Sequence, residues 1–390
     1  MTLTNSLPVP DRFAQQHSER LLALIKHKIN EAGGKITFAD YMQLCLYAPG
    51  LGYYSAGSHK IGDGGDFTTA PEISSLFSRS LANQIIDVLQ QLDHGNILEF
   101  GAGSGKMVVD VLRELHGKQC LPKHYYIIEA SADLRQRQQQ TINDAIPELK
   151  NRVVWLDKLP DAFIGVVLAN EVCDAMPVHR LHFNNGTSYE QYIVTIDDQL
   201  QWHDDVLSRS ELADKATEIE ALTGNTEYFT EVNLAAEGWL ASLTENIQQG
   251  AVFIIDYGYP QATYYHPQRS SGTLTCYYQQ QAHDNPLILV GLQDITAHVE
   301  FTSLAQIAVD NGLEVAGFQS QADFLLAAGI TELNSLSDSD DAFLILQQAT
   351  EIKRLTLPTE MGETFKVLTL TKNLDQLLPK INLGDRRYNL

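Results

Sequence analysis

Residues 97–107 read ILEFGAGSGKM, and this stretch decides the fold. An apolar run leads directly into Gly101, Gly103 and Gly105, and a helical pattern begins near Lys106. Glycine lets the chain turn sharply and lets its backbone approach a ligand without a Cβ clash. The start of a helix offers N–H groups and partial positive charge to an anion. The stretch therefore predicts a strand, a glycine loop and a helix; the alternative is a tight turn without a ligand.

The glycine spacing separates two kinds of ligand. A dinucleotide fingerprint needs glycine at the first, third and sixth positions, and Lys106 stands at the sixth here, which disfavours a nicotinamide-dependent dehydrogenase. Glycines at the first, third and fifth positions after the acidic Glu99 resemble class I S-adenosylmethionine-dependent methyltransferases instead. The cofactor implied is S-adenosyl-L-methionine, and its predicted loop contacts are Glu99, Gly101, Ala102, Gly103 and Gly105.

Further acidic residues are candidates for the same cofactor. Glu129 ends the second expected strand in YYIIEAS (125–131), where a carboxylate can accept both ribose hydroxyls. Asp157 follows the third strand and is a candidate acceptor for the adenine amino group; a solvated carboxylate is the alternative at both positions. Asp66 lies in GDFTTAPEIS (65–74), which is either a lid over the cofactor or a capping sequence with Pro71 at a helix start.

Strands alternate with helices from residue 96 onward. Continuous apolar runs are typical of central strands that helices cover on both faces. The sequence therefore predicts an α/β fold with a doubly wound, seven-stranded class I methyltransferase sheet, Rossmann-like in type. The expected strands are 96–100, 125–129, 152–156, 165–170, 251–256, 313–318 and 365–371.

The remaining segments are expected around this sheet. Asn185-Gly186 is a strong hairpin signal, and QRQQQ at 136–140 is interpreted as an exposed helix face. The domain prediction is an N-terminal helical region with a lid loop (1–95), a methyltransferase core (96–180 and 250–372), an inserted hairpin and helical region (181–249), and substrate-side insertions within the core (257–300 and 320–360).

The charge balance restricts the partners. Lys and Arg number 27 and Asp and Glu 49, for a net charge of −22. Such a surface repels phosphate backbones, so nucleic acid is not expected, whereas basic protein segments are attracted. The four cysteines form no CxxC pair and predict no metal site. The sequence shows no secretory signal and no apolar run of ~18 residues, so a cytoplasmic protein without a membrane segment is expected.

Several longer motifs carry a more specific resemblance. The chain resembles the family of mitochondrial complex I assembly-factor arginine methyltransferases, also called mitochondrial dysfunction protein A-like. The resemblance implies methyl transfer to an arginine of a protein partner, with symmetric dimethylation, and leaves the oligomeric state open, a homodimer being one option. The motifs are FADYMQLCLYAPGLGYY (38–54), GDFTTAPEIS (65–74), LANEVCDAMPVHR (168–180), FIIDYG (253–258), NPLILVGLQDITAHVEFTSL (285–304) and MGETFKVLTLTK (361–372).

Arginine is a poor nucleophile because its charge is delocalised and persists at neutral pH. Carboxylates beside the guanidinium orient it through bidentate bonds. Glu171, after the fourth strand, is assigned to guanidinium binding, Asp174 to a supporting carboxylate and Asn170 to cofactor or substrate contact. A helix N-cap with first-turn acids is the alternative. Asp256, which ends the fifth strand, either binds substrate or closes a turn.

Two other functions remain open at this point. One keeps the cofactor and changes the acceptor to a small molecule or another side chain. The other is an assembly chaperone that binds the cofactor and a partner without catalysis.

Overall fold

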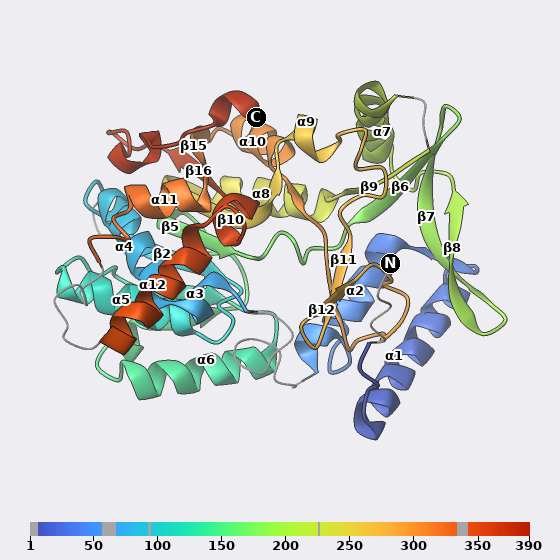
Figure 1. The fold of residues 1–390 in the computed structure, drawn as a ribbon, viewed down its shortest axis with the longest axis horizontal. Helices are drawn as coiled ribbons and strands as arrows, with labels where there is room; N and C mark the ends of the chain where they lie inside the picture. Colours follow the sequence, from blue (N-terminus) through green and yellow to red (C-terminus); the bar gives the residue numbers. More distant parts are fainter. Residues whose placement is uncertain (1–6, 57–67, 93–94, 225–226, 334–341) are drawn as a thin grey trace. The chain divides into compact units, whose positions relative to one another are not determined.

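The computed structural model describes residues 7–56, 68–92, 95–224, 227–333 and 342–390, which form two compact units (Figure 1). The N-terminal region expected over 1–95 is divided between them: it belongs to unit 1 up to Phe67 and to unit 2 from Thr68. Unit 1 comprises Met1–Phe67, Asp174–Ala236 and Gln261–His298; unit 2 comprises Thr68–Cys173, Glu237–Pro260 and Val299–Leu390.

Unit 2 is built on a mixed sheet that has eight strands among the described residues. All seven expected strands are present, and the short β14 is an eighth that pairs with β10. Pairing is parallel from β10 through β5, β2 and β3 to β4, and antiparallel on both sides of β16. The order is β15 (Glu314–Ser320), β16 (Phe365–Lys372), β10 (Ile247–Tyr259), β5 (Phe163–Asn170), β2 (Asn96–Phe100), β3 (Tyr125–Ile128) and β4 (Val153–Leu156), with β14 at Val299–Glu300.

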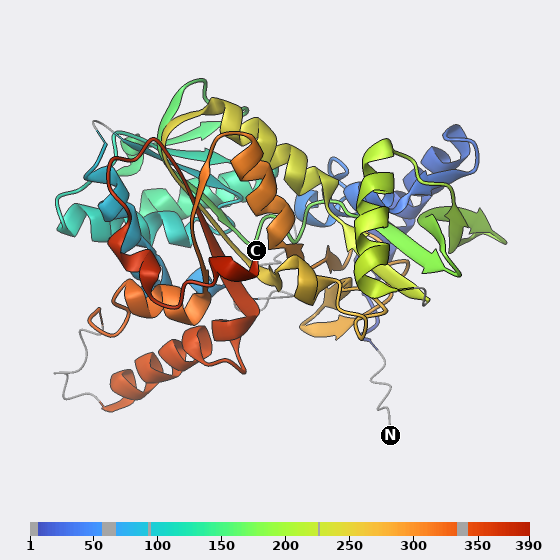
Figure 2. The same ribbon diagram turned by 90° about the horizontal axis from the view of Figure 1, so that it is seen from above.

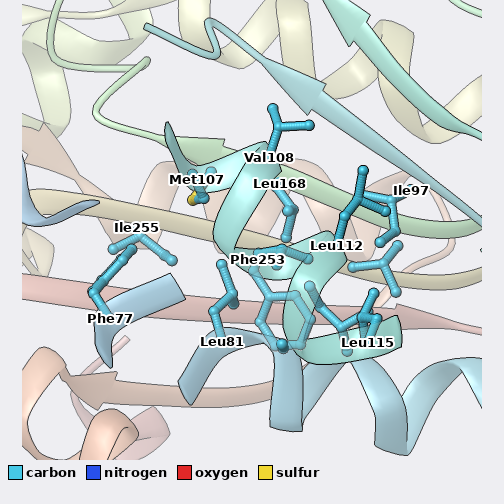
Figure 3. Close-up of a cluster of buried hydrophobic side chains, with 14 of the residues drawn as sticks. Phe77, Leu81, Ile97, Met107, Val108, Leu112, Leu115, Leu168, Phe253 and Ile255 are labelled. Atoms are coloured by element: carbon cyan, nitrogen blue, oxygen red, sulfur yellow. The ribbon is translucent and has the colours of Figure 1, made fainter. Parts of the chain in front are cut away.

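Both faces of this sheet are buried. Side chains alternate between the faces of a strand, so Phe253 and Ile255 of β10 lie on one face and Val252 and Ile254 on the other; all four are buried. Figure 3 shows Phe253 and Ile255 among side chains from helices α4 and α5. Figure 2 shows α8 and α12 on opposite sides of the strands. This burial is what keeps the strand ends at one edge in a fixed register.

Unit 2 begins with two helices, the short α3 and the longer α4. Ser74 separates them, because it leaves the helical conformation and caps α4 by accepting from the Leu76 amide. The helices are α3 (Ala70–Ile73), α4 (Ser75–Leu89), α5 (Lys106–Gly117), α6 (Ala132–Ala145), α8 (Leu234–Asn246, whose first residues belong to unit 1), α10 (Phe301–Asp310), α11 (Gln321–Ala327), α12 (Ala342–Thr356) and α13 (Met361–Thr364), with 3-10 turns η2 (Lys150–Arg152), η3 (Pro379–Asn382) and η4 (Arg387–Asn389).

The strands of unit 1 pair in an antiparallel manner. The hairpin expected at Asn185-Gly186 joins β6 and β7, with both turn residues at positive φ (52° and 73°), as a two-residue turn requires. One sheet has the order β1 (Lys35–Thr37), β7 (Thr187–Ile196), β6 (His179–Asn184), β9 (Tyr228–Val232), with β8 (Gln199–Asp205) paired to β7. The other has the order β12 (Gln281–His283), β11 (Thr275–Tyr278), β13 (Asp294–Thr296); the helical elements are α1 (Arg12–Glu31), α2 (Phe38–Tyr47), η1 (Tyr53–Ser55), α7 (Ser210–Thr223) and α9 (Gln261–Tyr264).

Among the described residues, none of the helices combines the length and the apolar composition that crossing a bilayer requires.

Candidate functional site

The glycine loop joins the end of β2 to the start of α5. Gly101, Gly103 and Gly105 have φ values of +61°, +52° and +84°, a region that glycine enters without the penalty of a Cβ. The amide of Gly101 donates to the carbonyl of Ile128 at 3.0 Å, and that of Gly105 donates to the carbonyl of Ala102 at 2.8 Å. The three glycines are therefore required by the turn itself.

The space around the loop differs from one end to the other. A Cβ built on Gly105 would lie 3.3 Å from the Cα of Gln138, so α6 packs closely against this end. A Cβ on Gly101 would meet only the Val172 side chain, at 3.5 Å, and Gly101 is exposed. Ala102 instead turns its side chain into the core. The open end at Gly101 presents backbone, which is the surface a ligand can approach.

The loop is also tied to α3. The Ser104 hydroxyl donates to the Glu72 carboxylate, and the Lys106 ammonium donates to the Glu72 carbonyl at 3.0 Å. The residue that occupies the sixth position of the glycine pattern thus directs its side chain to α3. α3 is the described part of the segment expected to act as lid or cap. Thr69 precedes it without a side-chain cap bond, and Pro71 lies in its first turn.

Glu129 follows β3, the parallel neighbour of β2, and lies beside the loop. One carboxylate oxygen accepts from the Ser131 amide at 2.9 Å, and the other accepts from the Gln138 side-chain amide at 2.9 Å. Burial raises the pKa of Glu129, and these bonds act in the opposite direction. The carboxylate is therefore held in one orientation and retains lone pairs for further donors.

Gln138 is a residue of this site that sequence reasoning missed. The run QRQQQ at 136–140 was expected on an exposed helix face, and this expectation is wrong for Gln138, which is fully buried. Its amide donates to the Gly103 carbonyl at 3.1 Å as well as to Glu129. The only signal in the sequence is the helical offset from Leu134 and Ile142, which places Gln138 on the buried side of α6.

Glu99 lies beneath the loop. Only 1% of its surface is exposed, and it accepts a hydrogen bond from the Tyr125 hydroxyl at 2.5 Å. Burial raises the pKa of Glu99 to about 8; the bond from Tyr125 opposes this shift and the nearby Glu129 adds to it. Glu99 therefore has almost no surface for direct contact with a ligand.

The end of β5 carries a second group of candidates, next to the end of β2. Glu171 has φ of +53°, an uncommon conformation for a residue other than glycine, and its amide donates to the Ile255 carbonyl at 2.9 Å. The Asn170 side-chain amide donates to the Glu171 carboxylate at 3.3 Å. Strained backbone of this kind persists where its surroundings enforce it, often at active sites.

Asp256 is one of the residues that hold the backbone of Glu171 in this conformation. It is fully buried, one carboxylate oxygen accepts from the Cys173 amide at 3.0 Å, and the other accepts from the Tyr257 amide at 2.9 Å. The carboxylate thereby closes the turn that carries Glu171.

The comparisons with known proteins identify the class of ligand. Residues 80–319, more than half of the chain, match the model of a family described as S-adenosyl-L-methionine-dependent methyltransferase. The chain belongs to this family.

Relatives and solved structures agree with that assignment. The chain is 29% identical over 378 residues to the protein arginine methyltransferase NDUFAF7 homolog of Drosophila melanogaster, covering 86% of this chain and 82% of the relative. It is 28% identical to human NDUFAF7, covering 94% and 85%. A Burkholderia thailandensis protein crystallised with S-adenosyl-homocysteine is 41% identical, with a TM-score of 0.94 over 99% of this chain and 100% of that one. The expected cofactor and the resemblance are confirmed.

One expectation about this methyltransferase is overturned. The Drosophila and human relatives are mitochondrial proteins by their names, which contradicts the prediction of a cytoplasmic location. The prediction failed because cysteines without a CxxC spacing are compatible with any reducing compartment and do not separate one such compartment from another.

The residues of this methyltransferase fit its cofactor. The glycine loop offers open backbone at Gly101, and Glu129 offers a fixed acceptor for hydroxyl groups. In the part of the chain that the structure describes, the Asn170 side-chain oxygen is buried without a hydrogen-bond partner, so an acceptor remains at the end of β5. No group of three His, Cys, Asp or Glu side chains in the described ranges is arranged to hold a metal ion.

The structure describes two of the three other predicted residues, Asp157 and Asp174. The Asp157 side chain is 89% exposed and pairs with Arg135 at 2.8 Å. Asp174 belongs to unit 1, where it is buried and its carbonyl accepts from the Ala297 amide at 3.0 Å. Asp66 lies outside the described residues.

Proposed function

We propose that this methyltransferase transfers the methyl group of S-adenosylmethionine to an arginine side chain of a protein. The observation that carries the proposal is Glu171, a carboxylate held at positive φ at the end of β5, beside the strand that leads into the glycine loop. The names of the relatives, which are protein arginine methyltransferases, support the same acceptor.

The cofactor site in this proposal is the glycine loop with Glu129. Gly101, Gly103 and Gly105 would let the backbone lie against the cofactor, and Glu129 would accept its ribose hydroxyls. Asp157 is kept as the proposed acceptor near the adenine, at the exposed end of β4. A cofactor bound there would supply a methyl group on a positively charged sulfur. The arginine nitrogen would gain this methyl group and lose a proton, and S-adenosyl-homocysteine would be the leaving group.

Glu171 has the proposed task of binding the guanidinium. A carboxylate accepts two parallel N–H bonds from arginine and draws positive charge toward itself. This orients the remaining nitrogen and raises its electron density for attack. The bond from Asn170 holds the Glu171 carboxylate, and the Asn170 side-chain oxygen is left to accept from cofactor or substrate.

Asp256 has the proposed task of positioning. Because its side chain is fully buried and accepts the Cys173 and Tyr257 amides, it would act on substrate through the turn that presents Glu171. Asp174, three residues after Glu171 in the chain, is kept as the proposed supporting carboxylate.

The architecture proposed for catalysis follows from these assignments. Unit 2 would be the methyltransferase core, with the seven-strand path from β15 to β4 as its doubly wound sheet. Unit 1 includes the hairpin of β6 and β7 and most of the predicted substrate-side insertion over 257–300. The net charge of −22 favours a basic segment as the protein substrate.

Mass spectrometry of arginine methylation tests the acceptor. Cells that carry the Glu171→Gln variant are compared with the wild type and with a Glu314→Gln control, which changes an exposed carboxylate of unit 2. We expect dimethylarginine on at least one protein to disappear in Glu171→Gln only, with cofactor affinity of the purified variant within a few-fold of wild type. Symmetric dimethylation is the expected product. Unchanged methylation would remove Glu171 from the mechanism, and cofactor binding without any methylarginine would favour another acceptor or a non-catalytic chaperone.

A further inference from the structure

We propose that Gln138 is a positioning residue of the cofactor site, whose side-chain amide joins the glycine loop to the Glu129 carboxylate and holds the two in binding geometry. The inference rests on the proposed cofactor site. It assigns a task to a residue that touches neither the reacting atoms nor, being fully buried, the solvent.

Three hydrogen bonds meet at this amide. Its nitrogen donates to the Gly103 carbonyl at 3.1 Å and to the Glu129 carboxylate at 2.9 Å. Its oxygen accepts from the indole N–H of Trp155 at 2.9 Å. Gln138 thereby connects the loop after β2, the acid after β3 and the strand β4, which are separate in sequence.

Trp155 sets the direction of the amide. An indole N–H is only a donor, so the amide oxygen must face Trp155 and the NH2 group must face the two acceptors. A flipped amide would set its oxygen against the Gly103 carbonyl and the Glu129 carboxylate, and three partly buried groups would lose the hydrogen bonds that they make here. The orientation is therefore determined by its neighbours, and Gln138 can hold only this arrangement.

The backbone of Gln138 lies close to the same loop. A Cβ on Gly105 would lie 3.3 Å from the Gln138 Cα and 3.5 Å from its Cβ. A side chain at this position would therefore crowd α6, and glycine leaves the room that lets the helix lie against the loop. The side-chain bonds of Gln138 then hold the helix and the loop together.

The carboxylate that Gln138 holds is the proposed ribose acceptor. An ionised carboxylate accepts from both hydroxyl groups, whereas a protonated one has less acceptor capacity. Burial raises the pKa of Glu129, and the bonds from Gln138 and from the Ser131 and Ala130 amides lower it. Removing the amide of Gln138 would raise the pKa of Glu129 further. The other charged groups nearby are Glu99 on β2, whose own pKa Glu129 helps to raise, and the Arg135–Asp157 ion pair.

Calorimetric titration with S-adenosyl-homocysteine, repeated from pH 5.5 to 8, tests this role. For Gln138→Leu we expect about tenfold weaker binding at pH 7, since a buried carboxylate and a buried carbonyl each lose a donor. We also expect the loss of affinity at low pH to begin at a higher pH than in the wild type. Trp155→Phe should weaken binding in the same direction by a smaller factor. Gln140→Leu is the matched control, because Gln140 lies on the same helix and is exposed.

The Glu129→Ala variant distinguishes a failure of the proposed cofactor site from a failure of the proposed role of Gln138. If Glu129→Ala binds as tightly as the wild type, the cofactor site itself is wrong. If Glu129→Ala binds weakly but Gln138→Leu binds normally with an unshifted pH profile, the positioning role is overturned. Weak binding by Gln138→Leu without a pH shift would indicate a packing defect and would also overturn it. Thermal unfolding shows whether each variant is folded. If Gln138→Leu does not fold, the same titration is made with Trp155→Phe instead.

Discussion

At the scale of single residues, two positive φ angles have different explanations. Gly103 has φ of +52° because the loop must turn back toward α5, and glycine enters this region without strain. Glu171 has nearly the same φ, +53°, although its side chain makes the conformation costly. The strain at Glu171 is held by the buried Asp256 and by the bond to Ile255.

Gly103→Val is expected to abolish cofactor binding. A β-branched residue is a steric outlier at this φ, so the loop must change its path, and the valine side chain would also cover backbone that the cofactor approaches. Calorimetry with S-adenosyl-homocysteine measures the effect. The control is Gly117→Ala at the end of α5, where a Cβ would meet no atom within 4 Å. Normal affinity in Gly103→Val would show that the cofactor binds elsewhere.

Glu99 predicts a pH dependence of stability. Its pKa is raised from 4.5 to about 8, chiefly by burial, so the folded state keeps a proton that the unfolded state releases above about 4.5. Below pH about 4.5 both states are protonated, and the free energy of unfolding includes the whole contribution of this proton. Between pH about 4.5 and about 8 the free energy of unfolding falls, by at most about 1.4 kcal/mol per pH unit.

Chemical denaturation at pH 5 and pH 8 measures this loss. Glu99→Gln keeps the neutral form at every pH, so its free energy of unfolding should fall less than that of the wild type between the two conditions. The exposed-site variant Glu314→Gln should follow the wild type. Equal falls in Glu99→Gln and the wild type would show that Glu99 is ionised when folded.

At the scale of elements, the glycine loop is supported from two sides. α6 holds it through Gln138, and α3 holds it through the bond from Ser104 to Glu72. α3 belongs to the segment expected as lid or cap, and its contact with the loop gives that segment a supporting role in unit 2. Such supports matter because a loop that carries three glycines has a large conformational entropy to lose.

Ser104→Ala is expected to weaken cofactor binding about two- to tenfold with little change in thermal stability, because the loop loses one tether while the core stays intact. Glu72→Ala should give a similar loss. A double-mutant cycle on S-adenosyl-homocysteine affinity measures their coupling. We expect the double variant to bind about as well as either single one; additive losses would show that the two residues act independently.

At the scale of the whole molecule, the proposed cofactor residues all belong to one of the two units into which the chain is divided. Thr68–Cys173 contributes the glycine loop, Glu129, Gln138 and the end of β5, and all of it belongs to unit 2. Unit 1 is assembled from three separate segments around antiparallel sheets. A ligand bound only by unit 2 stabilises that unit directly by mass action.

Hydrogen exchange with and without S-adenosyl-homocysteine is expected to show this division. At about one hundred times the dissociation constant the folded state gains ~2.7 kcal/mol. We expect added protection to be strongest in peptides covering 96–107 and 125–140 and weakest in the hairpin of β6 and β7. Protection concentrated in unit 1 would contradict the proposed site.

Many features of the fold and the class of enzyme could be predicted from the sequence alone. The seven expected strands, the hairpin at Asn185-Gly186, the glycine loop and the methyltransferase class are local in origin, since they depend on strand alternation, turn chemistry and glycine spacing. The sequence also places Glu129 at a strand end, because parallel strands present their carboxyl ends at one edge.

Only the tertiary structure decided which side chains meet. Gln138 joins Gly103, 35 residues away, to Trp155, 17 residues away, and the periodicity of a glutamine-rich helix gives no sign of those partners. Asp256 holds the backbone of Cys173, 83 residues earlier, so its carboxylate closes a turn. Long-range hydrogen bonds depend on how strands and helices pack. Local sequence patterns do not contain that information.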